Sequence, residues 1–295
     1  MLHLLLYFIA LISLSTSSSW AKLNEMPSEM LGFWRLSLAA VMLLTYQLVF
    51  VRKKIRLTKF EFKWITVSGF FFFLHLWTYK YAAKHTLISL TMILFATNPI
   101  WTAVGNIFAF KEAITRRMVF SFLIAFVGIF LLTYDQLSSN EQNTMGNISA
   151  LASAALFAIY VLSAKKARNT VSNLQFASLQ YSVCGFLFLL ASLFTKAPFI
   201  EGYHSISWIS VLGLIFVPTL LGHFLFSHAM TKMNLAVMTC GKLIEPIIAS
   251  FIAYYLFKEN LSPMTYVAFV FTSIAILNLF WPQIKPYIMT ATNKS

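Results

Sequence analysis

This chain of 295 residues contains few charged side chains. Aspartate, glutamate, lysine and arginine together make up 11% of it, whereas an ordinary soluble domain carries roughly 25%. So few charges cannot cover a globule of this size with a soluble surface. A hydrophobic content of 59% excludes intrinsic disorder as well. We therefore expect a polytopic membrane protein that lies in the lipid bilayer.

Other absences narrow the function. The only cysteines are Cys184 and Cys240, both within apolar runs, which excludes a disulfide scaffold. No set of His, Cys, Asp and Glu has the spacing of metal ligands, so we expect no metal. A nucleophile elbow, a His-Glu-x-x-His motif and a glycine-rich phosphate loop are also missing. We expect neither an enzyme nor a cofactor.

Acidic residues are fewer than basic ones, 9 against 22, for a net charge of +13. In a soluble protein this excess would indicate a nucleic-acid partner. Here most basic residues lie in short connections between apolar runs, which is the pattern of the positive-inside rule. We therefore expect no nucleic-acid partner.

A transmembrane helix needs about 20 mostly apolar residues, and the chain contains ten such runs. They are Leu2–Ala21, Met30–Val51, Phe62–Tyr81, Ile88–Phe110, Met118–Tyr134, Asn147–Ala164, Leu174–Thr195, Trp208–Met230, Leu235–Phe257 and Met264–Trp281. The connection 135–146 is the only one without Lys or Arg. It divides the chain into a first group of five runs, residues 1–140, and a second group, residues 141–295.

The basic residues also predict an orientation. With the N-terminus in the cytoplasm, fifteen Lys and Arg fall in inside connections and five in outside ones. We therefore expect ten spans in the bacterial inner membrane, with both termini cytoplasmic. The alternative for the first run is a signal peptide with its apolar region at Leu4–Leu14. No Lys or Arg precedes that region, so a retained span is favoured.

The last three runs of each group repeat each other at an offset of 147 positions, whereas the first two runs align poorly. Asn98-Pro99-Ile100 aligns with Glu245-Pro246-Ile247, and Phe110-Lys111-Glu112 aligns with Phe257-Lys258-Glu259. Because each group holds an odd number of spans, the two must lie in the membrane with opposite topology. We predict an all-α integral membrane fold of two inverted five-helix repeats, which is the construction of many secondary transporters.

Two prolines interrupt equivalent spans of the repeat. Pro99 and Pro246 each leave a carbonyl four residues earlier without its usual partner. In transporters with inverted repeats, the substrate site lies at such helix breaks near the middle of the membrane. The alternative is that each proline only kinks its helix for packing.

The chain resembles ten-span carriers of the drug/metabolite transporter superfamily, in particular the bacterial EamA-type exporters. The matching residues are Trp20, Lys22, Arg35, Pro99 with Phe110-Lys111-Glu112, Gly128-Ile129, and Glu245-Pro246 with Phe257-Lys258-Glu259. This chain has Lys-Glu at both span ends where that family has Gly-Glu or a similar pair. The resemblance covers nearly the whole chain and identifies no substrate.

The resemblance implies a secondary transporter, most often an exporter, of small metabolites such as amino acids or related amphipathic compounds. It would work by alternating access through a central cavity lined by the third, fourth, eighth and ninth spans. Two alternatives stay open: an uptake carrier for a host metabolite such as S-adenosylmethionine, and a non-transporting membrane enzyme or scaffold. A homodimer also stays open.

Lys242 and Glu245 are the candidate site residues with the most chemistry. An ionisable residue inside a span costs several kcal/mol and is a functional hypothesis by default. Their three-residue spacing places both on one helix face. Their repeat counterparts, Phe95 and Asn98, are uncharged, so the fold does not demand the charges. The pair is either an internal ion pair or a site where Lys242 meets a carboxylate and Glu245 an amine.

Further candidates lie on the spans expected around the cavity. His75 and His223 are mid-span and titrate near neutral pH when unperturbed, although a lone His in a bundle often only packs. Asn98, Trp77 and Trp101 also belong to the predicted substrate site, the two tryptophans as stacking surfaces. Trp20 of the first run is the remaining candidate, because Thr16, Ser19 and Trp20 share one face that should point to helices or a cavity. Arg35, in the second span, is expected either to snorkel to the outer surface or to close an outward gate with Glu25 or Glu29.

Overall fold

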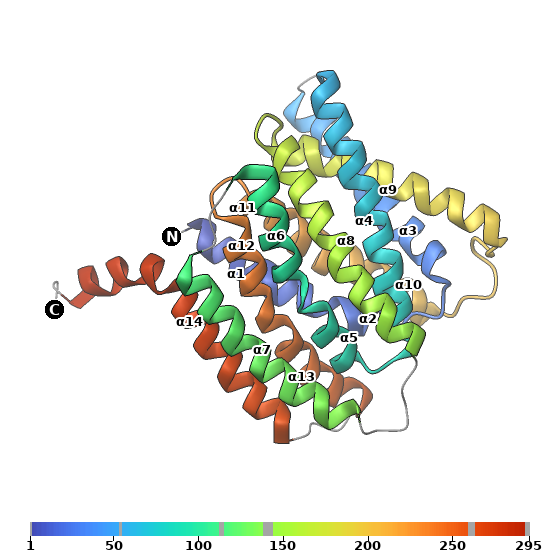
Figure 1. Cartoon of the computed structure of the whole chain (residues 1–295). Helices are drawn as coiled ribbons and strands as arrows, with labels where there is room; N and C mark the ends of the chain where they lie inside the picture. The colour runs from blue at the N-terminus through green and yellow to red at the C-terminus, as the bar shows by residue number, and fades with distance from the viewer. Residues whose placement is uncertain (1, 53–54, 112–114, 138–143, 259–262, 293–295) are drawn as a thin grey trace.

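The computed structural model describes residues 2–52, 55–111, 115–137, 144–258 and 263–292, and in these ranges the regular structure is entirely helical (Figure 1). The helical segments of the first half are α1 (Leu2–Ser15), α2 (Ser17–Lys22), α3 (Ser28–Tyr46), η1 (Gln47–Val51), α4 (Lys59–His85), α5 (Ile88–Phe95), α6 (Asn98–Phe110) and α7 (Arg116–Leu137). Those of the second half are α8 (Thr144–Arg168), α9 (Asn173–Thr195), α10 (Ser205–Leu214), η2 (Ile215–Phe224), α11 (Leu225–Ala229), α12 (Leu235–Gly241), η3 (Lys242–Ile244), α13 (Glu245–Phe257) and α14 (Pro263–Thr292).

Each of the ten apolar runs lies in one helix or in consecutive helical segments. Six stretches in the described ranges are long and apolar enough to cross a membrane. They are Leu2–Lys22, Ser28–Val51, Thr144–Arg168, Asn173–Thr195, Ser205–Ala229 and Val237–Phe257. The expected all-α membrane architecture is confirmed at this level. Glu112, Glu259 and residues 138–143, which the repeat and the polar connection include, lie outside the described residues.

Four helical stretches end in the same way. Arg52, Lys111, Lys196 and Lys258 follow η1, α6, α9 and α13, each with φ between 54° and 56°. A left-handed residue at this position lets the backbone N–H close the last turn onto a free carbonyl. A basic side chain there is also favoured by the negative end of the helix dipole. The four caps fall on the second and fourth runs of each half.

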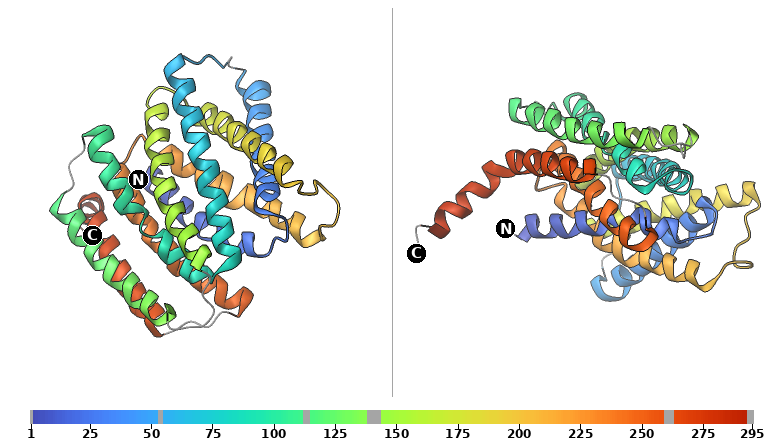
Figure 2. Two further views of the ribbon diagram at one scale, coloured as in Figure 1. Left: turned by 45° about the vertical axis from the view of Figure 1, so that its right-hand side comes forward. Right: turned by 90° about the horizontal axis from the view of Figure 1, so that it is seen from below.

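Helices of one half pack mainly against helices of the other. The most extensive contacts are α4 with α8, α3 with α9, and α7 with α14, and the last two helices run side by side in every view (Figures 1 and 2). The α1 helix packs on η2 and α11, α5 packs on α13, and α6 packs on α12. The core therefore lies between the two halves of the sequence.

Glycines allow two helix–helix contacts, α3 with α9 and α4 with α9, to be close. A Cβ added at Gly185 of α9 would come within 2.6 Å of Ser37 Oγ on α3, and one at Gly69 of α4 would come within 2.8 Å of Val183 on α9. Close backbone approach at small residues is a usual way for membrane helices to associate. These contacts hold α9 against α3 and α4.

Both proline-containing runs break in the middle. The α5 helix ends at Phe95 and α6 begins at Asn98, with Pro99 in its first turn, where a missing N–H costs nothing. The carbonyl that Pro99 frees is that of Phe95, and Asn98 Nδ2 donates to it at 2.9 Å. In the second half, the 3₁₀ turn η3 separates α12 from α13, which carries Pro246 in its first turn.

Candidate functional site

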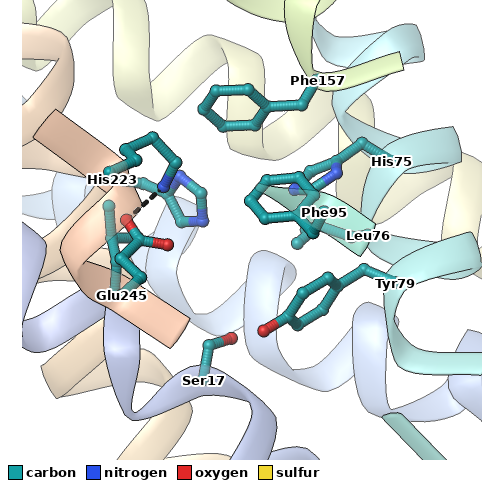
Figure 3. A pocket seen from close by; sticks show the side chains of 10 residues that line it. Ser17, His75, Leu76, Tyr79, Phe95, Phe157, His223 and Glu245 are labelled. Atoms are coloured by element: carbon teal, nitrogen blue, oxygen red, sulfur yellow. Dashed lines mark hydrogen bonds and ion pairs between the residues drawn. The ribbon is translucent and has the colours of Figure 1, made fainter. Parts of the chain in front are cut away.

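A cavity lies beside the two helix breaks (Figure 3). Its walls come from both halves of the sequence: Leu14, Ser17, His75, Leu76, Tyr79, Phe95, Phe157, His223, Lys242 and Glu245. Centres of water molecules can occupy about 20 Å³ of it, which is room for a water or two. A typical small-molecule pocket measures several hundred Å³, so in the described conformation this cavity is too small for a metabolite.

Lys242 and Glu245 form an ion pair at the cavity wall (Figure 3). Both are 3% exposed. The η3 turn places Lys242 one turn before Glu245, so the lysine Nζ reaches the carboxylate of its own segment. Burying two charges is costly, and the cost is offset only when each has its partner. Substitution of one partner would leave the other as an uncompensated buried charge.

Three phenylalanine rings surround the Lys242 ammonium. Its Nζ lies 4.9 Å from the ring centre of Phe157 and 5.5 Å from those of Phe95 and Phe226. The rings come from α8, α5 and α11, and α8 packs against both of the other helices. The negative faces of aromatic rings attract a cation, most strongly away from water. The three rings and Glu245 together enclose the Lys242 amino group and hold it in place.

Both predicted histidines line the cavity. His75 Nδ1 lies 2.8 Å from Ser153 Oγ and 3.1 Å from the Ser153 carbonyl oxygen, so it ties α4 to α8. His223 packs edge-on against Phe72, with ring centres 4.7 Å apart, and its Nδ1 is buried without a hydrogen-bond partner. In the described part of the chain, no group of three or more His, Cys, Asp and Glu is placed to hold a metal ion.

Four predicted substrate contacts lie away from this cavity. Trp101 is 49% exposed on the outer face of α6. The Asn98 side chain donates a hydrogen bond to the Phe95 carbonyl at the helix break. Trp77 packs on Phe73 beside a separate surface hollow, and Trp20 packs against Gly213 of α10. Their part in substrate binding stays a prediction, and their absence from this cavity follows from packing, because the position of a residue around a helix axis depends on its packing partners.

Arg35 neither snorkels nor closes a gate with the expected carboxylates. It is 1% exposed, and its Nε donates to Thr219 Oγ1 at 2.7 Å. In the described ranges no ion pair joins it to Glu25 or Glu29, and Glu25 Oε2 instead lies 2.8 Å from His204 Nδ1. Both sequence-based expectations for Arg35 were therefore wrong.

Sequence reasoning missed several cavity residues. Tyr79 lies one helical turn after His75, a spacing that would have indicated it. Phe95 is the repeat counterpart of Lys242 and lies opposite it. Phe157 and Ser17 carry no such signal, since α8 and α2 come to the cavity only through their contacts with other helices.

A comparison with protein families assigns the chain. The model of the EamA-like transporter family matches it twice, over residues 1–134 and 144–281. The chain belongs to the EamA-like transporter family. It is therefore a multi-pass membrane protein of a transporter family, as the resemblance in its motifs predicted.

Two curated relatives of this EamA-like protein are described as uncharacterized transporters. YetK of Bacillus subtilis (strain 168) is 24% identical over 70% of this chain. A protein of Buchnera aphidicola subsp. Schizaphis graminum (strain Sg) is 25% identical over 67% of it. The matches span 62% and 66% of the relatives' own lengths. Both descriptions favour a carrier over an enzyme.

The fold also matches a solved crystal structure of another protein. The TM-score is 0.73 at 15% identity, and the match covers 94% of this chain and 96% of the other. At that identity the likeness concerns the fold alone. The EamA-like protein therefore has a fold similar to that of a structure determined by experiment.

Proposed function

We propose that this protein is a secondary carrier that exports small amphipathic metabolites, such as amino acids, across the bacterial inner membrane. The observation that carries the proposal is the buried Lys242–Glu245 pair in the wall of a cavity between the two halves. Intramembrane ion pairs at broken helices are typical of substrate sites in secondary transporters.

The architecture we propose is ten spans in two inverted repeats, residues 1–140 and 141–295. The helix contacts support it, because they are unchanged when the halves are exchanged. The second, fourth and fifth runs meet their own counterparts, while the first meets the eighth and the third meets the sixth. In the pair formed by the fourth and ninth runs, α5 packs on α13 and α6 packs on α12. This crossing brings the first part of each run against the last part of the other, as in an antiparallel pair.

We place both termini in the cytoplasm. The distribution of basic residues supports this orientation. The N-terminal start of α1 and the C-terminal end of α14 also lie toward the same side of the bundle in each view (Figures 1 and 2). An even number of spans requires that arrangement.

Alternating access needs a closure on each side of the cavity. On the proposed inner side, the Tyr7 hydroxyl donates to the Met238 carbonyl at 2.5 Å, and Phe280 packs on the same ring. On the proposed outer side, Lys84 donates to the Met26 carbonyl, and Trp34 meets Trp208 edge-on at 5.4 Å. The Tyr7–Met238 and Trp34–Trp208 contacts join the first half to the second, whereas the Lys84–Met26 hydrogen bond joins α4 to the connection between α2 and α3.

Substrate binding in this proposal is an exchange of partners. A substrate amine approaches Glu245, and a substrate carboxylate compensates a cation of the cavity. The buried charges then stay compensated in both the empty and the loaded state, so neither state carries an unpaired buried charge. The Phe95, Phe157 and Leu76 side chains receive the apolar part of the substrate.

Counterflow in proteoliposomes tests the proposal. Vesicles loaded with one unlabelled amino acid or related metabolite should accumulate the labelled compound, saturably and against its gradient. Empty vesicles, and vesicles with Lys242→Ala protein, are the controls. Chemical conversion of a compound without exchange would instead support an enzyme, and neither exchange nor conversion across the panel would count against a carrier of these metabolites.

A further inference from the structure

The guanidinium of Arg35 is a buried cation with an incomplete set of partners. Its Nε donates to Thr219 Oγ1 at 2.7 Å, while its Nη2 is buried and has no hydrogen-bond partner. A buried donor without a partner costs free energy, and the cost is larger for a charged group. Such a group points to a ligand that completes the set when it binds.

A second unpartnered group lies on the same side. Thr219 and His223 are four residues apart in η2, a π-helical stretch in which that spacing keeps two residues on nearly one face. His223 is 4% exposed, lines the cavity, and has no partner for its Nδ1. Arg35 is within electrostatic reach of His223 and of two further cavity residues, His75 and Tyr79.

Lys242, Lys80 and Arg35 are three buried cations in this part of the bundle, and of these Lys242 lines the cavity. Lys242 has Glu245 and three rings. Lys80 donates to the Ser28 carbonyl at 3.4 Å and lies 5.1 Å from the Phe188 ring centre. Among these three buried cations, Arg35 is the one with an unpartnered polar atom in the described chain. An anion is the ligand that would complete its environment, and a carboxylate accepts a charge-assisted hydrogen bond from the free Nη2 of the guanidinium.

We propose that Arg35 and His223 form the subsite for the carboxylate of the transported compound, separate from the Lys242–Glu245 pair. This inference rests on the proposed function and assigns the anionic end of the substrate to a different residue. Lys242 is already enclosed by its carboxylate and rings. The carboxylate enters beside His223 and receives hydrogen bonds from Arg35 Nη2 and the imidazole, while the rings of Phe72 and Tyr160 border the site, 4.7 and 6.3 Å from that of His223.

Matched probes test this subsite without transport. The purified full-length protein is heated in detergent with 3-phenylpropionate or its amide, and with L-leucine or L-leucinamide. A ligand that binds the folded state raises the melting temperature. We expect the carboxylates to raise it more than the amides at equal concentration and ionic strength.

Arg35→Met is the diagnostic variant. It removes the charge and keeps the length of the side chain, and the loss of an unsatisfied buried charge should leave the empty protein as stable as before or more so. Its affinity for the carboxylates should fall about 10- to 100-fold, the range for hydrogen bonds to charged groups, and the preference over the amides should vanish. His223→Phe, which keeps the ring against Phe72, should lose part of the preference.

Arg168→Met is the matched control. Arg168 is 7% exposed, but its donors are taken by the carbonyls of Ser227 and Val171. This variant should be less stable when empty and should keep the preference for carboxylates. If Arg35→Met does not fold, Arg35→Lys and His223→Phe carry the test, with a weakened preference expected in both.

Three results would overturn the subsite: no shift with either carboxylate, equal shifts with acid and amide, or a preference that survives both Arg35→Met and His223→Phe. These results are distinct from a failure of the proposed function. Exchange in proteoliposomes without a carboxylate preference would support the carrier function and refute the subsite. A carboxylate preference without exchange would support the subsite and refute the carrier function.

Discussion

Lys242 and Phe95 occupy equivalent positions in the two halves and meet across the cavity. Each lies four residues before the proline of its broken helix, Pro246 or Pro99, and the Lys242 ammonium is 5.5 Å from the Phe95 ring centre. The sequence offset of 147 therefore places both residues at the same distance from a helix break. The two residues differ in chemistry, because Lys242 contributes a cation and Phe95 contributes a ring that stabilises this cation.

Lys242→Ala should abolish or strongly reduce exchange, while Lys242→Arg should retain part of it. Removal of one partner of a buried pair typically costs about 3–5 kcal/mol, because the other charge stays buried and uncompensated. Melting temperature and counterflow, measured on the same preparation, separate folding from transport. The double variant Lys242→Leu with Glu245→Gln removes both charges. If that variant folds and transports normally, the pair is only structural.

Gly241→Ala should open the inner side. A Cβ at Gly241 would collide with the Tyr7 hydroxyl, and displacement of Tyr7 breaks its bond to the Met238 carbonyl. The neighbouring Cys240 is free and buried, so its reaction with a thiol reagent reports the opening. We expect faster labelling of Cys240 in Gly241→Ala and in Tyr7→Phe, both made with Cys184→Ser. Labelling at the rate of the parent protein would contradict this closure.

Single cysteines should report the proposed topology. Lys59 is the first residue of α4 and Glu201 lies in the connection between α9 and α10, and both positions are exposed. An impermeant maleimide added to intact spheroplasts should label Glu201→Cys and spare Lys59→Cys, since the native cysteines are buried. Everted vesicles should give the reverse pattern. A cytoplasmic signal from a reporter fused at residue 140 would contradict both the ten-span topology and the inverted repeat.

Gly185→Ala should destabilise the fold by about 1–3 kcal/mol, the usual range for overpacking. The new Cβ would lie 3.1 and 3.3 Å from the Ser37 backbone N and Cα as well as close to its hydroxyl, so α3 and α9 must separate. Gly105→Ala is the matched control. Its Cβ meets only the end of the flexible Leu162 side chain, which can turn away. Equal melting temperatures for the two variants would be evidence against the close α3–α9 contact.

Glu61 should give α4 a pH-dependent N-terminus outside the membrane. Glu61 Oε2 accepts hydrogen bonds from the Thr58 N–H at 2.7 Å and from the Thr58 hydroxyl at 2.8 Å, which lower the pKa of the Glu61 carboxyl. A carboxyl with a lowered folded pKa stabilises the fold above its ordinary value of about 4.3, and that contribution is lost as the pH falls through the folded value.

The melting temperature of Glu61→Gln should therefore be below that of the parent at pH 7, and the difference should shrink in acid. Glu201→Gln, at an exposed position of a connection, should differ little from the parent at either pH. A Glu61→Gln difference that stays constant between pH 7 and pH 3 would show that the carboxylate charge does not stabilise this cap.

The sequence by itself determined the helices, the places where they break and one local ion pair. Apolar runs specify membrane helices because a backbone in lipid must satisfy its own hydrogen bonds. Pro99 and Pro246 specify breaks because proline cannot continue the hydrogen-bond ladder. Lys242 and Glu245 were predictable as partners because three residues separate them on one helical segment.

Only the tertiary structure decided which side chains face the cavity. Trp101 and Phe95 flank the same proline, yet one is on the outer face and the other meets Lys242. Arg35 is buried because Thr219, 184 positions away, accepts its hydrogen bond. A membrane helix that is apolar all round gives no sign of its inward face, since lipid and protein interior are equally apolar. Its rotation is therefore set by partners that lie far away in the chain.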